Sequence, residues 1–193
     1  QGSLLRDVAG ATVGAALYGL GLASFSGNPM QLLASGVKMP ILLLGAALLC
    51  FPTFHFVQIA HSRDPLNLKE ALRIVSTALA ATGLTWAALS PPVLFLVTTS
   101  HYYGLARGIA VAVGAAGGVA GLIRFRTLLR AHWQQEPQPA ERWAMRLYGL
   151  LFSVVGLQLA WVLRPFIGSP FLDFTWFRAL GSTPLAMLFG GGV

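Results

Sequence analysis

The chain contains very little charge: Asp, Glu, Lys and Arg make up only 10% of its 193 residues, against roughly 25% in an average soluble domain. A soluble fold needs many more polar side chains to cover its surface, so the composition excludes a soluble globular domain. It also excludes a disordered chain, because disorder requires low hydrophobicity and high charge. With a single cysteine, the chain has neither a disulfide framework nor a cysteine-based zinc site.

Apolar residues are what the chain has in abundance. Hydrophobic residues make up 55% of it, and the mean hydropathy is +0.69. The class that remains is an integral membrane protein, whose apolar surface is solvated by lipid. The first three residues, Gln1-Gly2-Ser3, lack a methionine, and we interpret them as the remnant of a cleaved tag.

Five apolar runs approach or exceed the length of about 20 residues that a membrane helix needs. The predicted spans cover residues 8–25, 40–60, 68–99, 105–125 and 142–163. The predicted fold class is therefore an all-α integral membrane bundle of five helices.

Prolines and capping residues predict how the second and third spans begin and bend. We expect Pro40 to open the second span, where its missing N–H has no cost, and Pro52 to kink it. Asn67 and Glu70 predict a capping box at the start of the third span. This span is predicted to be one helix kinked at Pro91-Pro92, and the alternative is a helix that ends at residue 89 with a re-entrant segment after it.

Residues 164–193 form an aromatic tail that prolines and glycines break too often for it to cross a membrane. We expect it to lie in the membrane interface. Its interleaved aromatic residues are Phe166, Phe171, Phe174, Trp176 and Phe177.

Five spans place the 13 basic residues unequally on the two sides of the membrane. Nine share the side of the N-terminus, namely Arg6, Arg63, Lys69, Arg73, Arg124, Arg126, Arg130, Arg142 and Arg146. The positive-inside rule then predicts a cytoplasmic N-terminus in a bacterial inner membrane. Orientation accounts for the net charge of +7, so we expect no nucleic-acid partner.

Three polar side chains are candidates for a site at membrane depth: His55, Gln58 and Gln158. Helical spacing places His55 and Gln58 on one stripe, and polar groups at this depth face protein or water rather than lipid. The alternative role is an interhelical hydrogen bond, which for Gln158 would join hydroxyls of the third span, namely Ser76, Thr77, Thr82 or Thr85.

No catalytic residue, metal site or cofactor is predicted. The six acidic residues lie near loops, which gives no carboxylate pair for acid–base catalysis. His55 has no second histidine at helical depth that would complete a bis-histidine site.

Glycine pairs on the first and fourth spans predict close helix packing, within one chain or between chains. They are Gly10 with Gly14, Gly114 with Gly118, and Gly117 with Gly121.

A polar loop at residues 124–146 carries the largest cluster of charge. Its arginines are Arg124, Arg126, Arg130, Arg142 and Arg146. They set the topology, or they bind anionic lipids or an acidic partner.

Two stretches resemble a family of uncharacterised bacterial multi-span membrane proteins, some of them labelled actin-binding WH2 proteins. The first runs from Lys38-Met39-Pro40 through Phe51-Pro52, and the second from Leu163-Arg164-Pro165 through Trp176-Phe177-Arg178. The overall plan is also similar to five-span proteins of the Yip1 type, and the resemblance covers most of residues 27–178. Leu68-Lys69-Glu70-Ala71 departs from the WH2 core and lies at a membrane helix start, and the resemblance implies no activity.

The sequence thus favours a non-enzymatic scaffold, sensor or subunit of a membrane assembly, either a homo-oligomer or one with a membrane-protein partner. The second hypothesis is a small ion channel or transporter with a polar path near His55, Gln58 and Gln158. The third is a membrane-embedded enzyme or cofactor carrier.

Overall fold

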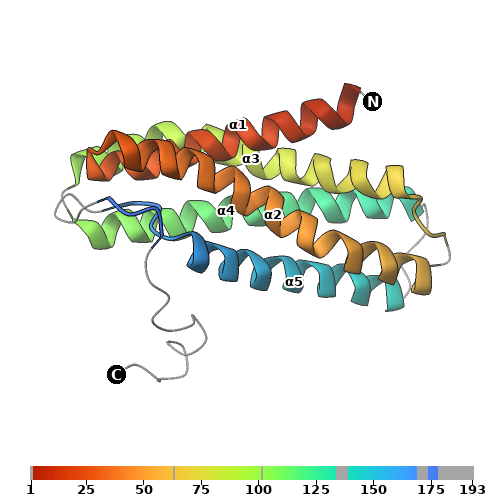
Figure 1. The fold of residues 1–193 in the computed structure, drawn as a ribbon. Helices are drawn as coiled ribbons and strands as arrows, with labels where there is room; N and C mark the ends of the chain where they lie inside the picture. The colour runs from red at the N-terminus through yellow and green to blue at the C-terminus, as the bar shows by residue number, and fades with distance from the viewer. Residues whose placement is uncertain (1, 63, 101, 134–138, 169–173, 178–193) are drawn as a thin grey trace, which may run out of the picture.

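A computed structural model of the chain describes residues 2–62, 64–100, 102–133, 139–168 and 174–177. These residues form five long helices and no strand, packed as an antiparallel bundle (Figure 1). The helices are α1 (Gly2–Ala23), α2 (Pro29–His61), α3 (Leu68–Thr99), α4 (Tyr103–Trp133) and α5 (Pro139–Leu163), with the short 3-10 helix η1 (Ser24–Ser26) after α1. The predicted all-α five-helix class is confirmed.

The surface of the bundle is that of a multi-pass membrane protein. Each of the five helices contains a segment long and apolar enough to cross a membrane. Large apolar side chains point outward along their length, and the Leu48 and Leu84 side chains are 74% and 71% exposed. Such a surface is suited to lipid, because exposing so much apolar area to water is unfavourable.

Helix α1 lies along both α2 and α3, while α4 packs on α3 and α5 packs on α2. The starts of α1, α3 and α5 and the ends of α2 and α4 meet at one end of the bundle (Figure 1). We call this end, which carries the exposed arginines of α4 and α5, the basic end. The aromatic tail leaves α5 at the opposite end, as the five-span prediction requires.

Helix α2 begins eleven residues earlier than the predicted second span, so the prediction that Pro40 opens it is wrong. The helix starts at Pro29, which occupies its first position, and the Asn28 side chain accepts a hydrogen bond of 2.9 Å from the Met30 N–H. A cap and a proline at the first position are sufficient local signals for a helix start. The polar residues between positions 30 and 38 interrupt the apolar run, so the predicted span begins later than the helix does.

Helix α3 runs unbroken through Pro91-Pro92 to Thr99, so the alternative with a re-entrant segment is wrong. Its start carries the predicted capping box. The Asn67 side chain accepts from the Glu70 N–H at 2.9 Å, and the Glu70 carboxylate accepts from the Asn67 N–H at 3.2 Å.

Helix α4 continues eight residues beyond the predicted span, which removes most of the predicted basic loop. Arg124, Arg126 and Arg130 lie on this helix rather than on a loop. The reason is a buried stripe at helical spacing, Phe125, Leu129 and Trp133, which anchors the added turns to the bundle. Arg142 and Arg146 lie on the first turns of α5, and Arg63 lies outside the described residues.

Candidate functional site

One face of α2 carries three buried polar side chains at spacings of four and three residues. Gln31, Ser35 and Lys38 are 3%, 0% and 2% exposed, and we call them the α2 polar stripe. A polar stripe on a membrane helix must find partners inside the protein, because lipid offers none. Here the partners are backbone carbonyls of the aromatic tail.

The tail turns back from α5 and lies against this stripe (Figure 1). The Gln31 amide donates hydrogen bonds to Ser35 Oγ at 3.0 Å and to the Pro165 carbonyl at 3.1 Å. The Ser35 hydroxyl donates to the Phe166 carbonyl at 2.6 Å. This part of the tail is therefore fixed to the bundle, with Ile167 buried. Its predicted position in the membrane interface stays a prediction.

Lys38 is the centre of the contact between the stripe and the tail. Its ammonium donates to the Pro165 carbonyl at 3.3 Å and to the Trp176 carbonyl. It also lies 5.9 Å and 5.1 Å from the ring centroids of Trp176 and Phe177. Carbonyl oxygens and ring faces together compensate the buried positive charge.

The sequence-based predictions do not include this site. In them Lys38 is only one of the 13 basic residues and the start of a stretch that carries the family resemblance. The signal that was present is the helical spacing of Gln31, Ser35 and Lys38. Of the three stripe residues, only Lys38 belongs to the stretches on which the family resemblance rests, while Pro165, Phe166, Trp176 and Phe177 of the tail all do. Phe171 and Arg178, which belong to the same tail, lie outside the described residues.

The structure brings His55 and Gln58 together near the end of α2. The His55 ring stacks on Phe51 with centroids 5.8 Å apart, and its Nδ1 atom is buried without a partner. Gln58 is 1% exposed, and neither polar atom of its amide has a hydrogen-bond partner among the residues that the structure describes. These two residues keep the features of an intramembrane polar site.

Gln158 does not join them. It lies toward the opposite end of α5, half-buried. Its neighbour Leu159 approaches Gly45 of α2, thirteen residues before Gln58 in the sequence, which corresponds to about 20 Å along a helix. A single polar path through all three residues is therefore not present in the described bundle.

The predicted hydrogen bond from Gln158 to the third span is also absent from the described residues. The four hydroxyls in question donate to carbonyls of their own helix, as seen for Ser76, Thr77, Thr82 and Thr85. Hydroxyls on membrane helices commonly form their hydrogen bonds with a carbonyl three or four residues earlier in the same helix. The single Thr77 hydroxyl proton is shared between the Arg73 carbonyl and the Asp7 carboxylate, whose oxygen lies 2.7 Å away and ties α3 to α1.

Half of the predicted glycine positions serve helix packing inside the chain. A Cβ at Gly14 would overlap the Gly83 carbonyl, a Cβ at Gly117 would overlap the Trp86 indole, and one at Gly121 would overlap the Thr82 hydroxyl. A Cβ at Gly114 would make only ordinary contact with the Tyr18 hydroxyl, at 3.7 Å. At Gly10 and Gly118 a Cβ would meet nothing within 4 Å. The partner Gly83 on α3 has no glycine four residues away and was missed for that reason.

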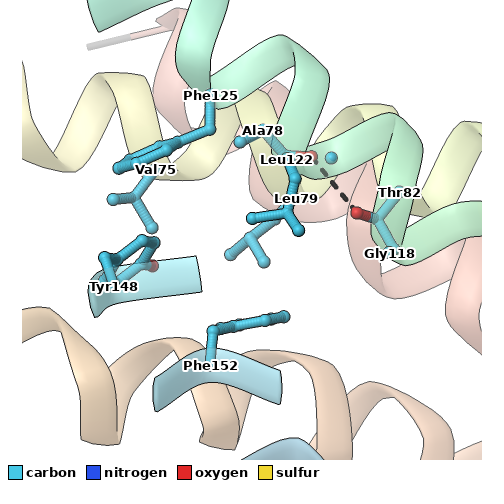
Figure 2. A pocket seen from close by; sticks show the side chains of 10 residues that line it. Val75, Ala78, Leu79, Thr82, Gly118, Leu122, Phe125, Tyr148 and Phe152 are labelled. Atoms are coloured by element: carbon cyan, nitrogen blue, oxygen red, sulfur yellow. Dashed lines mark hydrogen bonds between the residues drawn. The ribbon is translucent and has the colours of Figure 1, made fainter. Parts of the chain in front are cut away.

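An apolar cavity lies between α3, α4 and α5. Figure 2 shows the rings of Phe125, Tyr148 and Phe152 beside aliphatic side chains of α3 and α4. The cavity has a volume of about 30 Å³, close to the share of one water molecule in the liquid. It is too small and too apolar to hold a substrate.

A larger cavity of about 380 Å³ lies at the basic end, between the start of α3 and the end of α4, and Arg73 and Arg124 line it. All five arginines of the predicted cluster are exposed, but of these only Arg124 lines this cavity. Within the described parts of the chain, no three His, Cys, Asp or Glu side chains lie close enough to hold a metal ion.

Comparisons with protein-family models, with curated proteins and with solved structures found no match to this chain. The resemblance to bacterial multi-span proteins therefore stays a prediction.

Proposed function

We propose that this multi-pass membrane protein is a non-enzymatic subunit of a membrane assembly, with α4 as its contact helix. The observation that carries the proposal is the outward face of α4. Gly108, Ala112 and Ala116 follow one another at intervals of four residues and are all exposed. A Cβ at Gly108 would meet nothing within 4 Å.

Small residues at this spacing promote helix association in lipid, because they let two backbones approach closely. The opposite face of α4 already uses small residues for packing within the chain, since Gly117 and Gly121 leave room for the Trp86 and Thr82 side chains of α3. The outward face has the same chemistry and no partner helix among the described residues.

A second copy of this chain is the proposed partner. Two identical stripes of small residues are complementary to each other, as an interface with two-fold symmetry requires. The assembly would lie in the bacterial inner membrane with the basic end in the cytoplasm, since nine of the 13 basic residues flank that end in the sequence.

The test is the native mass of the purified protein in a mild detergent, compared with that of Gly108→Leu. We expect the wild-type chain to be a dimer or larger oligomer and the variant to be a folded monomer, because the added side chain keeps the two helices apart. Gly156→Leu is the matched control, since Gly156 on α5 also has open space around it. A monomeric wild-type protein, or an oligomer indifferent to Gly108→Leu, contradicts the proposal.

A small channel is the second candidate function. The buried amide of Gln58, which has no partner in the described part of the chain, favours it. Such a group is a natural neighbour for water or an ion at membrane depth. Ion flux into liposomes that is lost in Gln58→Leu supports this candidate. Flux that is absent, or unchanged in the variant, favours the assembly subunit.

A further inference from the structure

The cavity of about 380 Å³ at the basic end has features of a binding site that the assembly role does not require. Its polar walls come from Glu70, Arg73 and Thr77 on α3 and from Arg124 and His132 on α4. These residues lie far apart in the sequence, and the antiparallel packing of α3 on α4 brings them together.

Three of the five polar wall residues already have partners. The Glu70 carboxylate accepts the N–H of Asn67 in the capping box, and the Thr77 hydroxyl donates to Asp7. His132 Nε2 lies 3.6 Å from the Asp64 carboxylate. The side chains of Arg73 and Arg124 are exposed and make no hydrogen bond or ion pair with any described residue, so their guanidinium groups are available to a ligand.

The two arginines mark the same depth in the membrane. Arg73 is the last charged residue before the uncharged stretch of α3 that runs to Thr99. Arg124 is the first charged residue after the uncharged stretch of α4 that begins at Gly108. The cavity therefore lies where apolar helix surface gives way to charge, which is the level of lipid headgroups.

We infer that Arg73 and Arg124 together bind the phosphate of an anionic phospholipid headgroup. Guanidinium groups match phosphate oxygens with paired, charge-assisted hydrogen bonds. The two arginines and Glu70 give these walls a formal charge of +1 with His132 neutral, which complements a singly charged phosphodiester. A lipid is the source because acyl chains can extend from this level along the exposed apolar faces of α3 and α4.

The experiment titrates short-chain phosphatidylglycerol, short-chain phosphatidylcholine and inorganic phosphate separately into the detergent-purified protein. Native mass spectrometry detects bound lipid, and thermal unfolding measures the stabilisation. We expect phosphatidylglycerol to bind and stabilise far better than the other two. Arg73→Gln and Arg124→Gln should each weaken its binding about tenfold, the usual loss when a charged hydrogen-bond partner is removed.

The matched controls are Arg126→Gln and Arg130→Gln, which remove the same charge from exposed positions of α4 that do not line the cavity. They should bind the lipid nearly as well as the wild-type protein. Equal losses of phosphatidylglycerol affinity in all four variants would show that binding depends on overall positive charge rather than on this cavity, and would overturn the inference. Equal stabilisation by inorganic phosphate would overturn the lipid source and assign the site to a soluble phosphate ligand.

Discussion

At the scale of single residues, Lys38 shows how a membrane protein accommodates a buried charge. The residue is 2% exposed. Its ammonium bonds to two carbonyls and faces two aromatic rings. A cation at membrane depth is tolerated only with such partners. The same contacts fix the tail, so the charge has a structural role at this position.

Replacement of Lys38 by methionine should release the tail from α2. The substitution keeps an unbranched side chain, one atom shorter, but removes the donor to Pro165 and Trp176, with an expected loss of about 1–3 kcal/mol in stability. Hydrogen exchange of residues 164–168 and 174–177 should rise in Lys38→Met.

Arg107→Met serves as the control for this prediction, since Arg107 is an exposed basic residue of α4 near the same end. Its exchange pattern in the tail should match that of the wild-type protein. Unchanged exchange in Lys38→Met would mean that Gln31 and Ser35 hold the tail without the charge.

At the scale of helices, contact between small residues explains why α1 and α3 pack so closely. Within lipid the hydrophobic effect contributes little to helix association. Close backbone contact and side-chain packing must therefore hold the helices together. Gly14 of α1 lies against Gly83 of α3, and a Cβ at Gly83 would come within 2.6 Å of the Ala11 Cα atom. Backbone atoms cannot move aside as the end of a flexible side chain can.

Gly14→Ala should therefore destabilise the bundle although alanine is the better helix former. We expect a loss of about 1–3 kcal/mol, the usual cost of overpacking, measured by thermal unfolding in detergent. Gly10→Ala, one turn away in open space, should be neutral or stabilising by up to about 1 kcal/mol. A stabilised Gly14→Ala variant would show that α1 and α3 are not in this close contact.

At the scale of the whole molecule, helix length and charge together suggest how the bundle sits in a membrane. Helices α2, α3 and α4 contain 33, 32 and 31 residues, or about 46–50 Å of helix. The hydrocarbon core is about 30 Å thick. Part of each helix therefore extends into the headgroup region, or the helix tilts. The proposed lipid site would place the arginines of the basic end at the level of anionic headgroups.

Cysteine labelling of intact cells tests the proposed orientation. Ser169→Cys should react with an impermeant thiol reagent from outside, while Arg126→Cys should react only after the membrane is permeabilised. The native Cys50 is buried, so its background reaction should be low. The reverse pattern would place the N-terminus outside and contradict the positive-inside prediction.

The sequence alone determined the number of helices, because apolar runs longer than about 18 residues and local caps such as Asn67 with Glu70 act through near neighbours. The predicted start of α2 and the predicted end of α4 were wrong. Those ends depend on a cap in front of a polar stretch and on the buried stripe of Phe125, Leu129 and Trp133.

Only the tertiary structure decided which residues form sites. It joined the α2 polar stripe to the tail, paired Gly14 with Gly83, placed Arg73 and Arg124 on the walls of one cavity, and separated Gln158 from Gln58. The physical reason is that periodicity tells which face of a helix is apolar or polar, but not which other helix that face meets. The partner depends on close contacts between residues far apart in the chain, which no local pattern encodes.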